Sequence, residues 1–267
     1  MSKDFSPTGY DVVREISQGG MAQVYLAWQS SLNRQVALKV MSEDLYESAA
    51  FRELFLREAR IIARLDHPNI IKIYDVIEED RHLFISMEYA DGGNLKQQIR
   101  DGLVADRALE ITRDVAAALH FAHQENLIHN DVKPQNILFN QQGRVILADF
   151  GIARSFYEKR LFTLSGFSSG TPAYMAPEQF GDGKVDHRAD LYALGVVLFE
   201  MLSGQQPYKA KSLAELGSKH LSEAIPRLKD SRYQPLVDTM MAKEPDQRPA
   251  SGKRIVQMID AMLDGHF

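Results

Sequence analysis

The pattern of apolar residues changes once along this 267-residue chain, and that change constrains its fold more than any other feature. Before residue 88, apolar residues mostly alternate with polar ones in short segments, which is typical of β-strands. After residue 93 they recur every three or four residues, which is typical of helices. The stretch between these parts ends in two glycines and indicates a linker. We therefore expect a strand-rich lobe followed by a helical lobe.

The chain is longer than most chains that fold around a single hydrophobic core, and this length also favours two lobes. We expect an α+β fold with an N-terminal extension, an antiparallel-sheet lobe, a hinge and a mainly helical lobe at residues 1–9, 10–87, 88–93 and 94–267. In the first lobe we expect five strands, at 11–16, 23–28, 35–41, 70–77 and 82–87, around one long helix at 51–65. In the second we expect helices at 105–124, 190–202 and 251–263.

Composition favours a soluble enzyme domain. The 31 basic and 36 acidic residues are interspersed, with a net charge of −5, so no basic stripe for nucleic acid is present. The absence of cysteine excludes disulfides and thiolate metal sites. The longest apolar run, 191–202, is interrupted by Gly195 and Glu200 and is too short for a bilayer. We expect a cytoplasmic domain without membrane insertion, although attachment of a longer protein to a membrane stays open.

Two short motifs carry the chemistry: His-Asn-Asp-Val-Lys-Pro-Gln-Asn at 129–136 and Asp-Phe-Gly at 149–151. Transfer of a γ-phosphate needs an aligned hydroxyl and neutralisation of the developing charge. Asp131 can accept the hydrogen bond of that hydroxyl, and Lys133 can contact the phosphate. Asn136 and Asp149 offer oxygen ligands, which suit a hard cation such as Mg2+. Either motif alone could be an ordinary loop, but both at this spacing favour phosphoryl transfer.

These motifs resemble those of the eukaryotic-like (Hanks-type) protein kinases, and the resemblance extends from about Tyr10 to Met262. It implies a bilobal kinase fold. Val36-Ala37-Leu38-Lys39 resembles the strand whose lysine contacts the nucleotide. The segment 55–59 resembles the kinase helix whose glutamate pairs with that lysine. We assign this role to Glu58, with Glu53 of the same helix as an ordinary surface carboxylate.

The loop that would cover the phosphates departs from the family pattern. Residues 16–24 match the region G-x-G-x-x-G-x-V, but Ser17 and Ala22 replace the first and third glycines. Glycine at these positions lets backbone N–H groups approach phosphate closely. The remaining Gly19-Gly20 pair resembles the loop of bacterial Ser/Thr kinases, and an ordinary hairpin turn is the alternative. We expect nucleotide binding to survive, with modest affinity.

The resemblance implies a complete set of site residues. Asp131, Lys133, Lys39, Glu58 and Thr171 would be catalytic, with Asn136 and Asp149 as ligands for Mg2+, or for Mn2+ in its place. ATP would be held by Ile16, Gly19, Gly20, Val24, Ala37, Lys39, Met87, Glu88, Ala90 and Leu138. Within this set the adenine would bond to the backbone of Glu88 and Ala90.

Three further interactions are implied by the same resemblance. Asp190 would be buried and would bond to backbone N–H groups of the catalytic loop, with helix N-capping as its alternative role. Glu178 would pair with Arg248. His129 and Phe150 would stack with Ile62 and Ile73 into an apolar column, which gives His129 a structural role rather than that of a base.

The substrate class is also indicated. Lys133 followed by Pro134 resembles kinases that act on Ser and Thr of proteins. Residues 170–175 resemble the loop that receives the residue after the target hydroxyl, where Thr171 would bond to both Asp131 and Lys133. Gln135 replaces the glutamate of many arginine-directed kinases, so a preference for basic substrates is not expected. Autophosphorylation or a kinase-domain dimer is compatible with this assignment.

Asn130 differs from the family pattern at a position that regulates activity. Most family members carry an arginine there, and this arginine binds a phosphate on the activation segment. We expect a kinase that does not rely on this clamp. A pseudokinase scaffold is the main alternative, motivated by Ser17, Ala22 and Asn130, none of which is a proton acceptor or metal ligand. Small-molecule kinases share the Asp, Asn and Asp pattern but usually lack an Ala-Pro-Glu segment, which stands here at 176–178.

Overall fold

The computed structural model describes residues 7–19, 22–42, 46–79, 81–151, 172–181 and 184–265. Two compact units contain them: residues 7–66 and 70–91 in the first, and 67–69, 92–151 and the described residues from 172 onward in the second. Of the predicted site residues, Gly20 and Thr171 lie outside the described residues.

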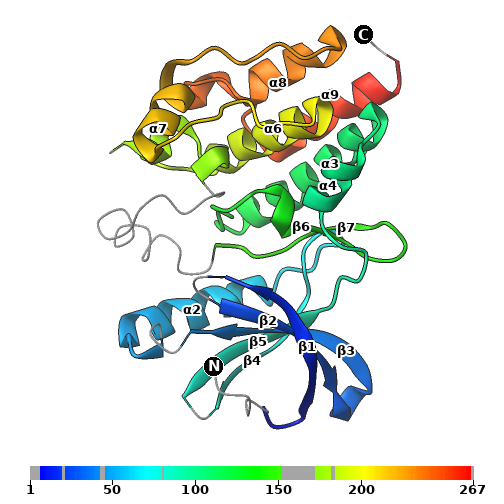
Figure 1. The fold of residues 1–267 in the computed structure, drawn as a ribbon, viewed down its shortest axis with the longest axis vertical. Helices are drawn as coiled ribbons and strands as arrows, with labels where there is room; N and C mark the ends of the chain where they lie inside the picture. Colours follow the sequence, from blue (N-terminus) through cyan, green and yellow to red (C-terminus); the bar gives the residue numbers. More distant parts are fainter. Residues whose placement is uncertain are drawn as a thin grey trace. The chain divides into compact units, whose positions relative to one another are not determined.

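The first unit is built on a five-stranded antiparallel sheet in the order β1-β2-β3-β5-β4 (Figure 1). Its strands are β1 (Tyr10–Gln18), β2 (Ala22–Gln29), β3 (Arg34–Met41), β4 (Ile73–Glu79) and β5 (His82–Glu88). The predicted strands are therefore confirmed, with small shifts at their ends. One face of the sheet carries the apolar core of Tyr10, Ala27, Val36, Leu38, Val40 and Phe84. Since side chains alternate along a strand, Ala37 and Lys39 lie on the opposite face.

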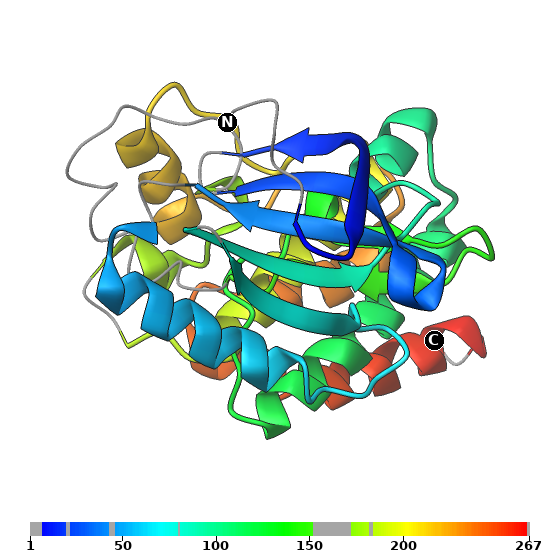
Figure 2. The same cartoon turned by 90° about the horizontal axis from the view of Figure 1, so that it is seen from below.

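The helix of this unit, α2 (Ala49–Ile62), runs along the sheet beside β4 (Figure 2). It begins after Ser48, whose side chain accepts the Phe51 N–H as an N-cap. It ends three residues before the predicted limit of 65, and β4 begins three residues after the predicted start at 70. Leu65, Ile70 and Ile71 are buried within the connection between these elements. These apolar residues are buried although they belong to neither element. The apolar pattern therefore predicted a helix that ends too late and a strand that begins too early.

The second unit is mainly helical. Its helices are α3 (Leu95–Asp101), α4 (Ala105–Gln124), α6 (Arg188–Ser203), α7 (Leu213–Ser222), α8 (Gln234–Met240) and α9 (Gly252–Leu263). A small antiparallel ladder joins β6 (Ile137–Phe139) to β7 (Val145–Leu147). The bounds of α4 agree with the prediction at both ends. Among the described residues, no helix combines the length and the apolar character that a membrane span requires.

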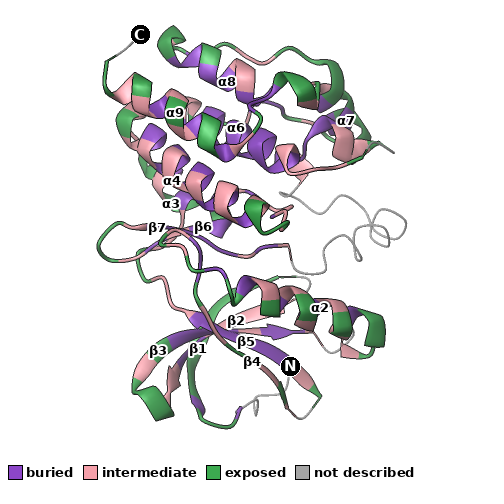
Figure 3. Ribbon diagram, turned by 180° about the vertical axis from the view of Figure 1, so that it is seen from behind, coloured by how far each residue is buried: buried purple, intermediate pink, exposed green. Residues whose placement is uncertain are grey.

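Helix α6 is the centre of this unit, and its residues from 189 to 201 are all buried (Figure 3). It packs against α4, α8 and the 3-10 turn η3 (Pro172–Tyr174). A helix that is apolar on all sides requires such enclosure, because no face of it can be left to water. The two charged residues in this buried stretch, Asp190 and Glu200, therefore need polar partners within the protein.

Helices α4 and α9 pack closely at Gly252. A Cβ atom at this position would lie 2.2 Å from the Ala116 carbonyl oxygen, which belongs to the α4 backbone. Such a contact cannot be relieved by a side-chain rotation, so the two helices would have to separate. By contrast, no heavy atom of the described residues lies within 4 Å of the corresponding Cβ position at Gly181, whose φ is negative.

We predict that Gly252→Ala lowers the free energy of unfolding by about 1–3 kcal/mol, the usual cost of overpacking. Urea unfolding followed by circular dichroism measures this change. Gly181→Ala is the matched control and should leave the midpoint nearly unchanged. Equal midpoints for the two variants would contradict the tight α4–α9 contact.

Candidate active site

The catalytic loop, residues 127–136, connects α4 to β6, and Asp190 of α6 fixes its backbone. The buried Asp190 carboxylate accepts the His129 N–H at Oδ2 and the Asn130 N–H at Oδ1, both at 2.8 Å. His123 of α4 lies 2.7 Å from the same Oδ2 through Nε2. The predicted role of Asp190 is confirmed. Asp190 is not the N-cap, because α6 begins at Arg188 with His187 in that position.

Three predicted site residues meet at the Asp131 carboxylate. Lys133 Nζ lies 2.7 Å from Asp131 Oδ2, and Asn136 Nδ2 donates to the same oxygen at 2.9 Å. Asn136 Nδ2 also donates to the Asp131 backbone carbonyl at 2.8 Å. Both side chains contact the same oxygen and restrict the rotation of the carboxylate. This arrangement suits a carboxylate that has to be aligned with an incoming hydroxyl.

The two proposed metal ligands lie at the end of the β6–β7 ladder. Asn136 directly precedes β6, and Asp149 follows β7 by two residues. The Ala148 N–H donates to the Asn136 carbonyl at 2.8 Å, which brings the two chain segments together. Because Asn136 uses its amide nitrogen on Asp131, its side-chain oxygen is the atom that can ligate a cation. An amide oxygen beside a carboxylate is a donor set that fits a hard divalent ion.

His129 is held by three contacts in a structural role. Its ring lies 4.5 Å from the Phe150 ring, measured between centroids, so this one contact of the predicted column is confirmed. Nδ1 accepts the Asp131 N–H at 3.2 Å, and Nε2 lies 3.1 Å from the Ala148 carbonyl oxygen. Complete burial lowers the pKa of His129. The neutral ring therefore donates through Nε2 and supports the loop without acting as a base.

In the first unit, the sheet brings several predicted nucleotide contacts onto one face. Val24 of β2 is paired with Lys39 of β3, and Ala37 of β3 is paired with Met87 of β5. Paired residues of antiparallel strands point to the same face, as do residues two apart in one strand. Val24, Ala37, Lys39 and Met87 therefore share the face opposite the apolar core.

Strands β1 and β2 pair as an antiparallel hairpin, which both interpretations of this motif require. Gly19 donates its N–H to the Ala22 carbonyl at 2.9 Å, next to the two positions outside the description. Ile16 lies at an irregularity of β1, where the register with β2 shifts, and is 39% exposed. The role of this hairpin in phosphate binding stays a prediction.

Helix α2 distinguishes Glu58 from Glu53. Phe51, Phe55, Ala59 and Ile62 form its buried stripe. Glu58 is three residues after Phe55 and four before Ile62, so it lies on this stripe and is half-buried, whereas Glu53 is exposed. Its position on the inward side of the helix favours Glu58 as the partner of Lys39, and that pairing stays a prediction.

The backbone after β5 offers a defined set of groups for an adenine. The Glu88 N–H already donates to the Lys72 carbonyl at 2.8 Å, so a bond from Glu88 to a base has to use its carbonyl oxygen. Two residues on, the Ala90 N–H has no hydrogen-bond partner among the described residues. One acceptor and one donor, two residues apart, match the edge of an adenine. Leu138 of β6, in the second unit, is half-buried.

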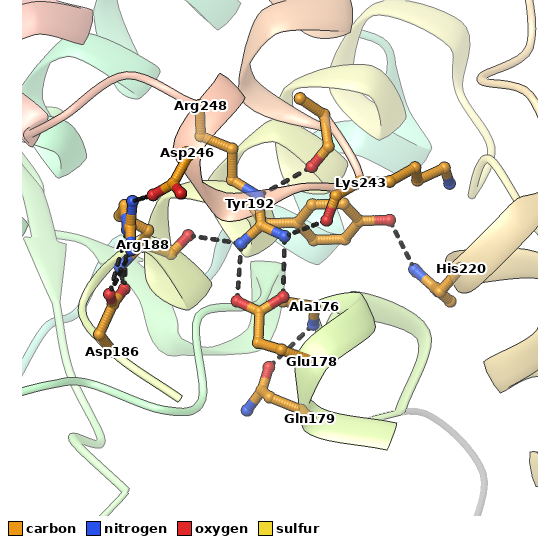
Figure 4. A network of polar contacts seen from close by, with 11 residues as sticks. Ala176, Glu178, Gln179, Asp186, Arg188, Tyr192, His220, Lys243, Asp246 and Arg248 are labelled. Atoms are coloured by element: carbon orange, nitrogen blue, oxygen red, sulfur yellow. Dashed lines mark hydrogen bonds and ion pairs between the residues drawn. The ribbon is translucent and has the colours of Figure 1, made fainter. Parts of the chain in front are cut away.

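Glu178 and Arg248 form the predicted ion pair, which is buried (Figure 4). Arg248 Nη1 and Nη2 donate to the two Glu178 oxygens at 2.7 and 2.8 Å. The same guanidinium donates to three backbone carbonyls, those of Ala242, Lys243 and Arg188. The Arg248 side chain is 0% exposed, and each of its N–H groups has an acceptor. The pair fixes the turn η4 (Pro177–Phe180) to the helical unit.

Sequence reasoning missed a second buried carboxylate. Glu200 of α6 is 2% exposed, and Lys96 of α3 lies 2.6 Å from its Oε1. Its other oxygen accepts the Tyr174 hydroxyl at 2.6 Å, and Gln206 donates to that hydroxyl at 3.1 Å. Burial beside this carboxylate strongly raises the pKa of Tyr174, so the phenol remains a donor. The signal available in the sequence was a single acidic residue inside an apolar helical run.

These features define a class of protein. The sequence profile of the protein kinase domain matches residues 10–263, nearly the whole chain. The chain therefore belongs to the protein kinase domain family, and both the predicted family and the predicted fold are confirmed.

Its relatives include bacterial serine/threonine-protein kinases. The chain is 40% identical over 230 residues to PrkC of Bacillus subtilis, covering 85% of this chain and 35% of PrkC. It is 38% identical to PknD of Mycobacterium tuberculosis over 271 residues, covering 100% of this chain and 40% of PknD. The chain thus spans well under half the length of these relatives. A crystal structure of the Mycobacterium tuberculosis PknI kinase domain superimposes with a TM-score of 0.75 at 29% identity, covering 99% of both chains.

We predict that Arg248→Met lowers the free energy of unfolding by about 3–5 kcal/mol, because it leaves the Glu178 carboxylate buried and unpaired. The double variant Glu178→Gln/Arg248→Met should lose less than the sum of the two single variants. Urea unfolding of the three variants gives this comparison. Asp246→Asn, which removes an exposed partner of Arg188 in the same network, is the control and should change little. Strict additivity of the two single effects would contradict a coupled buried pair.

Proposed function

We propose that this domain transfers the γ-phosphate of ATP to serine and threonine hydroxyls of proteins. The observation that carries the proposal is the Asp131 carboxylate, which Lys133 and Asn136 hold on a loop fixed by Asp190. In the reaction, the acceptor oxygen forms a bond to the γ-phosphorus while the bond to the bridging β-oxygen breaks and ADP leaves. Asp131 aligns the acceptor hydroxyl and takes its proton. Lys133 neutralises charge on the transferred phosphoryl group.

The protein kinase family uses ATP together with a divalent metal ion. We propose Mg2+, or Mn2+ in its place, held by the Asn136 side-chain oxygen and the Asp149 carboxylate. When bound, the metal neutralises phosphate charge. On the first unit, Lys39 would contact the α- and β-phosphates, with Glu58 orienting its ammonium. Glu88 and Ala90 would bind the adenine through their backbone, with Ile16, Gly19, Gly20, Val24, Ala37, Met87 and Leu138 around the nucleotide.

We propose residues 172–180, named here the substrate segment, as the part that receives the acceptor peptide. It follows directly after Thr171, the proposed partner of Asp131 and Lys133. The contacts that support this role fix the segment at two points: Tyr174 bonds to Glu200, and Glu178 pairs with Arg248. A rigid surface beside the acceptor hydroxyl is what peptide positioning requires. We also propose protein substrates and a cytoplasmic site of action, and autophosphorylation or a kinase-domain dimer is compatible with them.

We predict that three substitutions separate the proposed roles. Asp131→Asn preserves shape but removes the proton acceptor, so kcat should fall by about 10²–10⁴ while nucleotide affinity persists. Asp149→Asn weakens the metal site, so metal-nucleotide affinity and turnover should both fall. Lys39→Met keeps the packed stem and deletes the charge, so catalysis should fail with little change in folding. Calorimetric nucleotide titration and single-turnover kinetics with a generic acceptor protein measure these effects.

Asp149 is replaced by Asn rather than by Ala because its backbone has a positive φ of 58°. Asn tolerates this left-handed conformation, whereas Ala would add backbone strain to the loss of a ligand. If Asp131→Asn abolished nucleotide binding as fully as Asp149→Asn, or kept normal turnover, the two roles would be wrongly assigned. Nucleotide binding by the wild type without any phosphate transfer would favour the pseudokinase scaffold.

We also propose that activity does not depend on a phosphate clamp at Asn130. Asn130 has a φ of 61°, and its N–H is bonded to Asp190. Its amide nitrogen lies 3.5 Å from the Ile128 carbonyl, so the side chain remains near its own loop. Asparagine is suited to this left-handed position but cannot supply the positive charge that binds a phosphate.

We predict that replacing Thr163, Ser165, Ser168 and Ser169 together by Ala leaves kcat within about twofold of the wild type, because no arginine follows His129 to bind a phosphate there. These four residues lie outside the described part of the chain. Steady-state transfer to a peptide is the measurement, and phosphatase-treated wild type is the control. A collapse in kcat with nucleotide binding intact would contradict the proposal.

A further inference from the structure

The buried carboxylate of Glu200 contacts the substrate segment, and a lysine covers it from the solvent side. Tyr174 of the segment donates its hydroxyl to Glu200 Oε2, and Lys96 Nζ donates to Oε1, each at 2.6 Å. The Glu200 side chain is 2% exposed, whereas the Lys96 side chain is 46% exposed. The carboxylate is therefore screened from water, and the side chain that screens it reaches the surface. A single carboxylate separates the Lys96 ammonium from the substrate segment.

The start of α3 fixes the position of Lys96. Asn94 is the N-cap of this helix. Just before it, the Gly92 N–H donates to the Phe139 carbonyl at 2.7 Å, which joins the chain to β6. Lys96 is in the first turn of α3, where the helix dipole disfavours a cation. Helix stability therefore does not account for a lysine at this position, whereas its contact with Glu200 does.

The Lys96 ammonium has donors left for an external partner. A lysine side chain carries three N–H donors. Among the described residues, Glu200 is its only hydrogen-bond and ion-pair partner. Because nearly half of the Lys96 side chain is exposed, the remaining donors can be reached from solution. The pair is neutral as a whole, but the end that faces outward is positive.

The surface on the other side of the Tyr174 hydroxyl also lacks a carboxylate. Gln206 donates to this hydroxyl at 3.1 Å and lines a surface pocket of about 210 Å³. The described residues around this pocket include Gln205, Lys209 and Lys219, and none of them is acidic. Lys219 is balanced by two neighbouring glutamates, whereas Lys209 bonds to the neutral side chain of Gln205. The region beside the segment thus offers cations and amides to a ligand.

We propose that Lys96 is a specificity-determining residue, which selects acceptor peptides with a carboxylate side chain near the target hydroxyl and disfavours peptides with a basic one there. Its ammonium attracts a carboxylate of the peptide. Because it covers Glu200, a lysine or arginine of the peptide cannot pair with that carboxylate. Selection of this kind combines an attractive and a repulsive element. The inference rests on the proposed role of the substrate segment and names the class of peptide that the segment receives.

A positional scan of acceptor peptides tests this role. In each peptide, Glu or Arg replaces one residue on either side of the acceptor serine, and kcat/KM is measured. The wild type should prefer Glu to Arg by about three- to tenfold at one or two positions, as expected for an exposed charge pair. Lys96→Gln removes the ammonium and uncovers Glu200. At the same positions, the ratio of Glu to Arg should fall by about tenfold or more and reverse in favour of Arg.

Three further variants assign the effect to this pair. Lys96→Arg keeps the charge and a donor for the carboxylate, so the preference for Glu should remain. Lys96→Gln/Glu200→Gln removes both charges, leaves no unpaired carboxylate and should show neither preference. Arg100→Gln is the matched control, because it removes a positive charge one turn further along α3. Its side chain is 78% exposed and pairs with Asp101, so the ratio should stay within about twofold of the wild type.

Equal kcat/KM values for Glu and Arg peptides in the wild type would overturn the inference, as would equal changes of the ratio in Lys96→Gln and Arg100→Gln. A uniform loss for all peptides that follows a lower melting temperature would show a structural role alone and would also overturn it. If the wild type transferred phosphate to no peptide, the proposed function would fail. Calorimetric binding of the same peptides, with alanine as the acceptor residue, would then decide: a preference for Glu that depends on Lys96 supports the inference, and its absence overturns it.

Discussion

The second unit depends on one carboxylate more than on any other group. Asp190 is on a helix that is buried on all sides, yet it accepts two backbone N–H groups of the catalytic loop and contacts a histidine of α4. A buried carboxylate is costly unless its oxygens are bonded, and backbone donors are the partners that move least. The requirement to satisfy Asp190 therefore fixes the loop, and the loop in turn holds Asp131, Lys133 and Asn136 in one arrangement.

The same physical requirement recurs around α6. Glu200 is neutralised by Lys96 and bonded by Tyr174, and Glu178 is neutralised by an arginine whose every N–H is used. Such pairs contribute little net stability compared with apolar packing, because both charges lose their hydration. Their effect is on specificity of structure, since each side chain has only one position that satisfies its partner. Segments that contain only short 3-10 turns, such as 172–180, gain a defined position in this way.

The sequence predicted most of the fold because its apolar periodicity is strong where elements bury one broad face. Helix α4 was placed correctly at both ends, and α2 and β4 were misplaced only where Leu65, Ile70 and Ile71 are buried without regular structure. Helix α7 was not predicted, since only one of its three buried residues, Leu216, has an apolar side chain, the others being Gly217 and His220. The roles of Asp190 and Arg248 were predicted from motifs. The partner of Glu200 could not be predicted, because Lys96 is 104 residues away in the chain and only the fold brings the two residues together.

The close contact between α4 and α9 also bears on how the unit is made in the cell. Helix α4 has a buried face over most of its length, and residues 252–263 pack against it. During synthesis, these residues leave the ribosome after every other helix described in the unit. Until then, the apolar surface of α4 is exposed, and such surface favours aggregation and chaperone binding. The Gly252–Ala116 contact thus makes completion of the unit a late event in translation, while the first unit has all of its described strands available much earlier.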